Sequence, residues 1–330
     1  MLSILFVIYY NFSISRSFES VNTLHNHINQ TDCTQYHAKF LSREIPEVEE
    51  QKGFAKAYVT RTTSSYPFYW STHSPELDPI RKTSFEKGNY YEFQLSMRVI
   101  EAIEEGKKKG GEVIFLDVGA NIGWFSLLAR SYGATHVYSF EPNPVNVLRM
   151  CESLTLNNWK DDSVHIMQMG VGNKDEKKIL HQFNPNPGAF TFDEVRVSNY
   201  KDKEKAVGEF QIKKLDTFAE EMGWFQRKQR IAFFKLDVEG YEHAVIEGAT
   251  KLIEARLIQY VSFEFNAKRG YKAVEPMISV FFEGGYELYM HGRMRGPSNK
   301  VEKKYSSSSD LTSDIISGTM YGENLLFRLK

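Results

Sequence analysis

Two glycines and an acidic residue form the pattern in this chain that is most typical of a ligand site. The segment Phe115–Trp124 (FLDVGANIGW) places Asp117 at the end of an apolar run, directly before a loop that contains Gly119 and Gly123. Glycines in such a loop allow the backbone to approach a ligand closely. A carboxylate there would repel a pyrophosphate, but it suits a ligand that carries an ammonium or sulfonium group.

The spacing of this loop disfavours two other classes of nucleotide site. The dinucleotide fingerprint is G-x-G-x-x-G, whereas the loop after Asp117 reads G-x-N-x-G. A Walker-type phosphate loop requires G-K-[ST], which does not occur in the chain.

A second acid, Glu141, follows the next apolar run in the segment VYSFEP. An acid at a strand end can accept hydrogen bonds from both hydroxyls of a ribose. Taken singly, Glu141 could be a turn residue and Asp117 a helix cap. Their order at consecutive strand ends favours a shared nucleoside site.

The segment FKLDVEGYEH supplies the candidates for catalysis. Asp237, Glu239 and His243 follow an apolar run, and a positioned carboxylate or histidine can remove a proton from a hydroxyl. His243 could equally be a helix-surface residue. Lys235 in the same segment either pairs with a neighbouring acid or takes part in catalysis.

These residues require strands and helices that bring them to one edge. Short apolar runs alternate with segments of helical periodicity, which predicts a parallel sheet with helices on both faces. The predicted strands are 113–118, 136–140, 164–169, 231–236, 258–265, 286–291 and 324–329, and the predicted helices are 92–105, 124–132, 144–157, 215–222 and 241–254.

Four motifs in this order resemble the FkbM-type family of S-adenosylmethionine-dependent methyltransferases: DVGANIG, FEPNP, KLDVEG and the final NLLF. The resemblance implies an α/β, Rossmann-like class I methyltransferase fold with a mostly parallel seven-stranded sheet. It implies methyl transfer from S-adenosyl-L-methionine, usually to an oxygen of a sugar or another small hydroxylated molecule. By the family pattern, Asp117, Gly119, Asn121 and Gly123 surround the methionine part of the cofactor, Glu141 holds the ribose, and Gly170 and Val171 line the adenine.

A divalent metal is an alternative source of activation for the acceptor hydroxyl. Asp237, Glu264 and Asn266 would place two carboxylates and an amide at adjacent strand ends, a set that suits magnesium. The arrangement is loosely similar to that of catechol-type O-methyltransferases, whereas the FkbM-type family is not marked by a metal.

Two long loops, 181–209 and 292–322, are expected to form the acceptor site. Arg293 and Arg295 could bind an anionic acceptor, or they could belong to a solvated basic loop. Trp70 and Tyr69 could stack on a sugar face, although such residues are more often part of a core.

Composition limits the range of partners. The chain has 330 residues, 42% of them hydrophobic, and a formal net charge of -1, which argues against nucleic acid as the main partner. No apolar stretch is long enough to span a membrane. The acceptor's identity and the oligomeric state remain open.

The N-terminal part is expected to lie outside the catalytic domain, which we assign to residues 88–330. Residues 1–15 resemble a signal peptide without its basic lead-in or could be a membrane-proximal segment, and residues 16–87 form an extension. A signal would place the protein in the secretory pathway or outside the cell, whereas its absence would leave the protein in the cytoplasm. The two cysteines, Cys33 and Cys151, could pair or remain thiols.

Two other functions remain open at this point. The chain could be a catalytically silent protein that keeps the cofactor fold, or a nicotinamide-dependent oxidoreductase, which the G-x-N-x-G loop disfavours.

Overall fold

The computed structural model describes most of the predicted catalytic domain and parts of the extension. The described residues are 30–33, 58–73, 90–159, 162–182, 188–198, 205–265, 271–292, 305, 307, 311 and 323–330. The predicted signal at residues 1–15, together with Asn266, Arg293 and Arg295, lies outside them.

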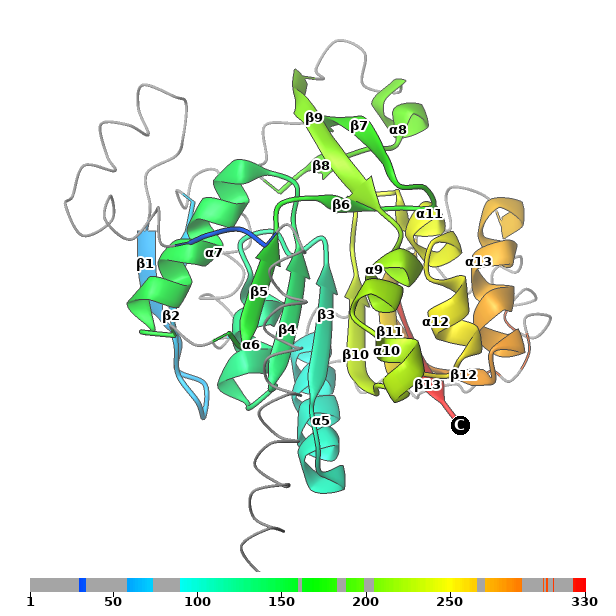
Figure 1. Cartoon of the computed structure of the whole chain (residues 1–330), viewed down its shortest axis with the longest axis horizontal. Coiled ribbons are helices and arrows are strands. Elements are labelled where there is room, and N and C mark those ends of the chain that lie inside the picture. The colour runs from blue at the N-terminus through cyan, green and yellow to red at the C-terminus, as the bar shows by residue number, and fades with distance from the viewer. Residues whose placement is uncertain are drawn as a thin grey trace, which may run out of the picture.

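A seven-stranded sheet forms the centre of the molecule, in the order β12-β13-β11-β10-β3-β4-β5 (Figure 1). Five consecutive strands, from β11 to β5 in this order, pair in parallel with one another. Strand β13 pairs antiparallel with both of its neighbours, β11 and β12. The sequence prediction of a mostly parallel seven-stranded sheet is therefore confirmed. The bounds are β3 Ile114–Val118, β4 His136–Phe140, β5 Val164–Met167, β10 Ile231–Leu236, β11 Ile258–Phe265, β12 Tyr286–Gly292 and β13 Glu323–Leu329.

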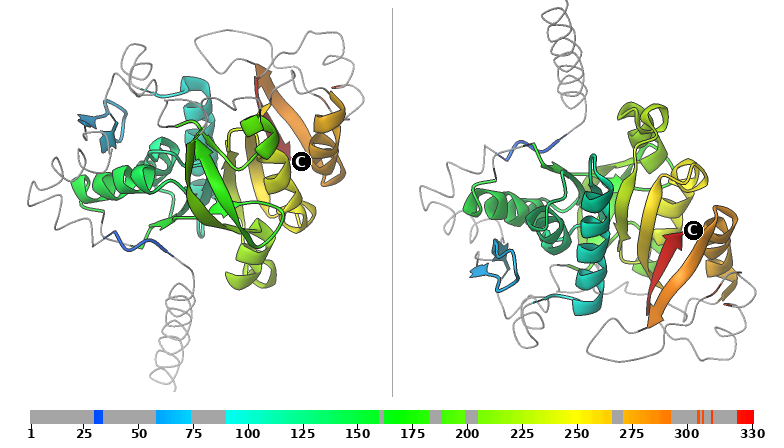
Figure 2. Two further views of the ribbon diagram at one scale, coloured as in Figure 1. Left: turned by 90° about the horizontal axis from the view of Figure 1, so that it is seen from above. Right: turned by 90° about the horizontal axis from the view of Figure 1, so that it is seen from below.

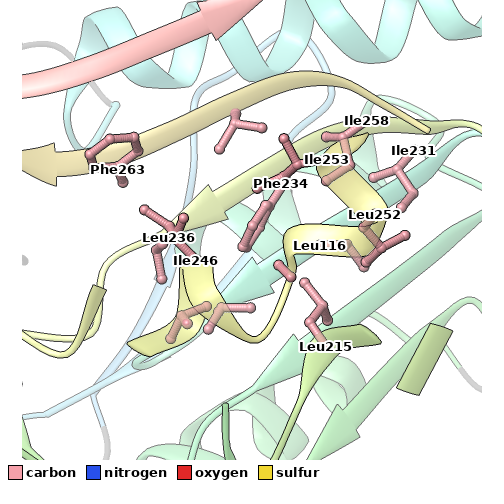
Figure 3. Close-up of a cluster of buried hydrophobic side chains, with 14 of the residues drawn as sticks. Leu116, Leu215, Ile231, Phe234, Leu236, Ile246, Leu252, Ile253, Ile258 and Phe263 are labelled. Carbon is pink, nitrogen blue, oxygen red and sulfur yellow. The ribbon is translucent and has the colours of Figure 1, made fainter. Parts of the chain in front are cut away.

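Helices cover both faces of the sheet (Figures 1 and 2). Alternate residues of the strands enter two separate cores, so that Leu116 packs in one and Phe115 in the other. In the first core, Leu116 and Phe234 lie close to Leu215 and Leu252 from the covering helices (Figure 3). That face carries α9 Leu215–Glu221, α10 Trp224–Arg227, α11 Glu242–Glu247, α12 Thr250–Glu254 and α13 Tyr271–Glu283, and the other face carries α5 Phe93–Lys109, α6 Trp124–Ser131 and α7 Pro144–Leu156.

A second sheet of four strands lies beyond the carboxyl ends of the parallel strands (Figure 1). The prediction of a loop over 181–209 is wrong in part, because a two-residue strand and a helix lie within that range and two longer strands extend into it. Most residues of the two longer strands of this sheet are exposed or only partly buried, which makes their sequence too polar to match a buried strand. The order is β6-β9-β7-β8, with β6 Gly170–Val171, β7 Glu176–Gln182, β8 Phe190–Thr191, α8 Glu194–Ser198 and β9 Lys205–Lys213.

Local signals explain where some helices begin and end. Helix α7 begins with Pro144 at its first position, and the Asn143 side chain accepts a hydrogen bond from the Val145 amide at 3.1 Å. The single helix predicted over 241–254 is divided, because α11 ends before Gly248 and α12 begins at Thr250. A Cβ built on Gly248 would lie 1.9 Å from the carbonyl oxygen of Gly172. This position therefore has room only for glycine.

Two parts of the N-terminal extension pack on the domain. The hairpin of β1 Tyr58–Arg61 and β2 Tyr69–Thr72 lies against α7. Residues 30–33 lie beside β5, where the Thr31 amide donates to the Ile166 carbonyl at 2.7 Å. This contact covers part of the open edge of the sheet.

Cys33 and Cys151 form a disulfide that joins residues 30–33 to α7. The sequence left this pairing open. No helix in the described part of the chain has both the length and the apolar character needed to cross a bilayer.

Candidate cofactor and acceptor site

The predicted site residues follow the carboxyl ends of β3, β4 and β10. Because these strands are parallel neighbours, the loops at 119–123, 141–143 and 237–240 meet at one edge of the sheet. This edge is where open α/β sheets bind their ligands.

The loop from Gly119 to Gly123 adopts a backbone that side chains disfavour. Gly119 has φ 79°, Asn121 φ 52° and Gly123 φ 83°. A Cβ built on Gly119 would lie 1.8 Å from the carbonyl oxygen of Asp237. Glycine at 119 therefore allows the loop after β3 to touch the loop after β10.

Asp117 lies beneath this loop, with its side chain fully buried. Its Oδ2 accepts a hydrogen bond from Ser126 at 2.6 Å, and its Oδ1 lies 3.5 Å from the ammonium of Lys235. Burial raises the pKa of Asp117, and Lys235 opposes that rise. The contact between Asp117 and the methionine part of the cofactor stays a prediction. In this structure, Asp117 forms an ion pair with Lys235.

Lys235 links the two loops. Its ammonium donates to the carbonyl of Gly119 at 2.8 Å and lies 3.7 Å from Oδ2 of Asp237. Burial alone would lower the pKa of Lys235, but the carboxylates of Asp237 and Asp117 raise it above its usual value. Of the two interpretations that the sequence left open, pairing with a neighbouring acid is the one that this geometry favours.

Glu141 connects the glycine loop to the start of α7. Its Oε2 accepts from the Asn121 amide at 2.8 Å, and its Oε1 accepts from the Asn143 amide at 2.9 Å and from Asn146 Nδ2 at 3.3 Å. Burial raises the pKa of Glu141 to about 7, against the effect of these bonds. A carboxylate held in this way has a fixed orientation, and its role toward a ribose stays a prediction.

Gly170 and Val171 form β6, and both are buried. A Cβ on Gly170 would lie 2.5 Å from the side chain of Ile212 and 2.6 Å from that of Phe192. Val171 packs in the core with Leu215. Their predicted role beside an adenine stays a prediction.

The three predicted catalytic residues follow β10 and differ in exposure. The side chain of Asp237 is 37% exposed, Glu239 is half-buried with φ 54°, and His243 is exposed near the start of α11. Asp237 is thus an accessible carboxylate beside the glycine loop. The catalytic role of each residue stays a prediction.

Glu242 is the first residue of α11 and follows the loop at 237–240. Its role beside this loop was missed by the sequence prediction. It is buried, and its Oε1 accepts hydrogen bonds from the amides of Val238 at 3.1 Å and Gly240 at 3.0 Å. These bonds fix the backbone on both sides of Glu239. The detectable signal was an acid in the first turn of a helix.

An apolar cluster lies next to the loop at 237–240, on the side of the four-stranded sheet. Phe190 and Phe210 pack against it and are only partly buried, as is Val238 of the loop. Lys178 lies 5.0 Å from the ring centre of Tyr241 and 3.9 Å from Glu194. The cluster itself comprises Leu180, Phe192, Ile212, Tyr241 and Ala244.

The predicted metal set is only partly described. Glu264 is the penultimate residue of β11 and is exposed, whereas Asn266 lies outside the described residues. Within those residues, no group of three or more His, Cys, Asp or Glu side chains is arranged to hold a metal ion.

Trp70 does not meet the expectation of a sugar-stacking residue. Its side chain is fully buried, and its Nε1 donates to the Ile122 carbonyl at 3.0 Å. A buried ring cannot stack on a ligand, so Trp70 is a core residue, which is the alternative that the sequence favoured. Tyr69, in contrast, is 42% exposed.

Comparison with known proteins identifies the domain. The model of the methyltransferase FkbM domain matches residues 117–288, just over half of the chain. This range begins at Asp117 and contains Glu141, Asp237 and His243. A search of curated proteins gives no match.

Several solved structures are similar at low sequence identity. The methyltransferase FkbM from Methylobacillus flagellatus KT shares 13% identity with a TM-score of 0.34, over 66% of this chain and 43% of that one. The SAM-dependent methyltransferase from Agrobacterium tumefaciens shares 9% with a TM-score of 0.40, over 84% and 71%. The magnesium protoporphyrin IX methyltransferase from Synechocystis PCC 6803, solved with bound SAM, shares 12% with a TM-score of 0.35, over 72% and 79%. This chain spans less than half of the first of these proteins.

Proposed function

The chain belongs to the FkbM family of methyltransferases, and from this premise we propose that it is an active O-methyltransferase. The donor is S-adenosyl-L-methionine. The acceptor is a hydroxyl of a sugar, a glycan or another small hydroxylated molecule.

The observation that carries this proposal is the position of Glu141 beside the glycine loop. Its carboxylate is held by the amides of Asn121 and Asn143, at the strand-end edge where nucleosides bind in such sheets. The donor set fits the cofactor, because the Glu141 carboxylate, held beside the glycine loop, suits ribose hydroxyls.

The cofactor supplies an electrophilic methyl group on a sulfonium when it is bound. Asp237 is placed to accept the proton of the acceptor hydroxyl, because its carboxylate is accessible and its orientation is set by Lys235. Glu242 holds the backbone that carries Asp237 and Glu239. The contribution of the protein is therefore positioning together with removal of a proton.

The side chains around the apolar cluster support a hydroxylated acceptor with an apolar face. Phe190 and Phe210 are partly buried aromatic rings. They pack against the same apolar cluster as Val238, which belongs to the loop at 237–240. Aromatic rings of this kind pack on the apolar face of a sugar ring. Lys178 adds a positive charge close to Tyr241, which would suit an acceptor with an acidic group.

We also place the protein in the secretory pathway or outside the cell. The support is the disulfide between Cys33 and Cys151, because disulfides persist in oxidising compartments and are rare in the cytosol. Alkylation of free thiols before reduction, in protein from its source cells, tests this placement. Modification of both cysteines at that stage would contradict it.

Methyl transfer is tested with the full-length protein, a methyl-labelled donor, and a panel of neutral and acidic sugars and glycans from the source cells. We expect labelled ether products, and the methylated hydroxyl is then identified by mass spectrometry. The Glu141→Gln variant should bind the donor about tenfold more weakly, because the ribose hydroxyls lose a charged acceptor. Binding of S-adenosylhomocysteine without turnover on any acceptor would instead indicate a silent protein.

The metal alternative is tested in the same assay. If Asp237, Glu264 and Asn266 held a divalent ion, a chelator would abolish labelling and magnesium would restore it. Our proposal uses no metal, so labelling should persist in excess chelator.

A further inference from the structure

The hairpin of the N-terminal extension is bound to the helix that follows Glu141. Its backbone pairs with the side chain of Asn157, which accepts from the Tyr69 amide and donates to the Tyr69 carbonyl, both at 2.7 Å. The Ser71 amide donates to Ser153 Oγ at 2.9 Å. The hairpin is therefore fixed on α7 along the length of β2.

Trp70 extends from this hairpin to the glycine loop. Its indole donates to the Ile122 carbonyl at 3.0 Å, and its ring lies 5.0 Å from that of Trp124 in an edge-on contact. Ile122 lies between Asn121 and Gly123, which both have positive φ. The bond from Trp70 therefore restrains the peptide in the centre of the unusual backbone.

His73 extends from the end of the same hairpin toward Glu141. Its Nε2 lies 2.8 Å from Oδ1 of Asn146, and Nδ2 of Asn146 lies 3.3 Å from Oε1 of Glu141. His73 is buried, and burial lowers its pKa to about 4, so the ring is neutral at physiological pH.

Two hydrogen bonds lead from His73 through Asn146 to Glu141, and we call this series the relay. The direction in which its hydrogen bonds are donated follows from the partners of His73. Within the described residues, Nδ1 of His73 has no hydrogen-bond partner. The proton of the neutral ring therefore lies on Nε2 and is donated to Asn146 Oδ1. That bond fixes the amide of Asn146 with its nitrogen toward Glu141, where it donates to the carboxylate.

We propose that Trp70 and His73 of this hairpin are positioning residues of the cofactor site. Trp70 sets the conformation of the loop at 119–123, and His73 sets the carboxylate of Glu141 through Asn146. The inference rests on the proposed function in that it takes this loop and Glu141 as ligands of the cofactor.

The test measures binding of S-adenosylhomocysteine to the full-length protein by calorimetry. His73→Phe keeps a ring but removes the donor, and we expect about a tenfold weaker Kd, since one hydrogen bond to a charged network is lost. His73→Gln can still donate to Asn146 and should restore the affinity to within about threefold of the original. Trp70→Phe should weaken the Kd by about as much as His73→Phe.

Ser71→Ala is the matched control within the same hairpin. Ser71 Oγ donates to Glu152 on α7, and among the described residues no hydrogen bond joins Ser71 to the glycine loop or to Glu141. This variant should lower the melting temperature while leaving the Kd within about twofold of the original. An equal loss of affinity in Ser71→Ala and His73→Phe would overturn the inference, because the hairpin would then act through stability alone.

A double-mutant cycle tests the connection to Glu141. In a Glu141→Gln background, His73→Phe should change the Kd by less than about twofold, because the charged acceptor of the relay is gone. An undiminished tenfold effect in that background would also overturn the inference.

A second readout requires no ligand. In the cofactor-free protein, hydrogen exchange of the Asn121 amide should be faster in Trp70→Phe and His73→Phe than in Ser71→Ala. Failure of the original protein to bind S-adenosylhomocysteine would remove the proposed function and this inference together. Normal binding by every hairpin variant would remove this inference alone.

Discussion

The proposed cofactor side and the proposed acceptor side of the strand-end edge are stabilised by different interactions. On the cofactor side, Asp117, Glu141 and Lys235 are buried, and each is bonded to a neighbouring loop or helix. On the acceptor side, an apolar cluster supports a loop whose acids are half-exposed.

This difference has a physical consequence for recognition. A buried polar network requires particular atoms at particular positions, because each unsatisfied group costs free energy. An apolar cluster tolerates exchange of its members as long as the volume is kept. The cofactor side is therefore expected to keep its residues, and the acceptor side can adapt to different hydroxylated molecules.

The largest effect is expected on the acceptor side, from Asp237→Asn. Loss of a positioned base should lower kcat about 10²- to 10⁴-fold, while the Kd for S-adenosylhomocysteine stays within about twofold. Steady-state kinetics and calorimetry check this pair of values. Glu254→Gln, an exposed acid on α12, is the control and should leave both unchanged. A normal kcat in Asp237→Asn would remove Asp237 from the chemistry.

The next effect concerns the stability of the cofactor side. Lys235→Met leaves Asp117 buried without its cation, which should lower the free energy of unfolding by about 3–5 kcal/mol. Adding Asp117→Asn should recover part of that loss, because the uncompensated charge is removed. Urea denaturation measures both variants. Equal stability of the single and double variants would show that the pair is not coupled.

A pair of glycine variants compares the two sides directly. Gly119→Ala forces a side chain into φ 79° and against the Asp237 carbonyl, so the Kd for S-adenosylhomocysteine should rise at least about tenfold. Gly208→Ala in β9 has only an ordinary contact with the Phe210 ring, at 3.4 Å, and should change the Kd by less than about twofold. Similar losses in both variants would contradict the distinction between the two sides.

The smallest effect is the pH dependence of binding on the cofactor side. Because burial raises the pKa of Glu141 to about 7, the free protein holds a proton there below pH 7. If the ribose requires the carboxylate, binding releases that proton, and affinity falls as pH falls. Between pH 8 and pH 6 the Kd should rise roughly tenfold. Calorimetry in two buffers measures this change and the released proton, and Glu141→Gln should show neither.

The parallel strands could be predicted from the sequence because each is apolar on both faces. Strands β4, β10 and β11 have the predicted bounds, since their apolar runs end sharply at charged or turn residues. The four-stranded sheet was missed because β7 and β9 are mostly exposed or partly buried, and because β6 and β8 are each only two residues long. Helix α13 was also missed, and it contains Pro276, which disfavours a helix interior.

The candidate site could be predicted only where it is local in sequence. Asp117 and Glu141 were found because each ends an apolar run. The bond from Trp70 to Ile122 and the relay from His73 were not, because each joins residues far apart in the chain through side chains whose direction depends on the packed fold. Lys235 is intermediate, since its pairing was one of two interpretations that the sequence allowed.

The disulfide also orders events during synthesis. Cys33 precedes Cys151 by 118 residues, so it leaves the ribosome while β3, α6 and β4 are still to be made. The bond can close only after α7 has emerged, when the first parallel strands are available to pair. Residues 30–33 are thus fastened covalently only after α7 has been made, and until then Cys33 is a thiol.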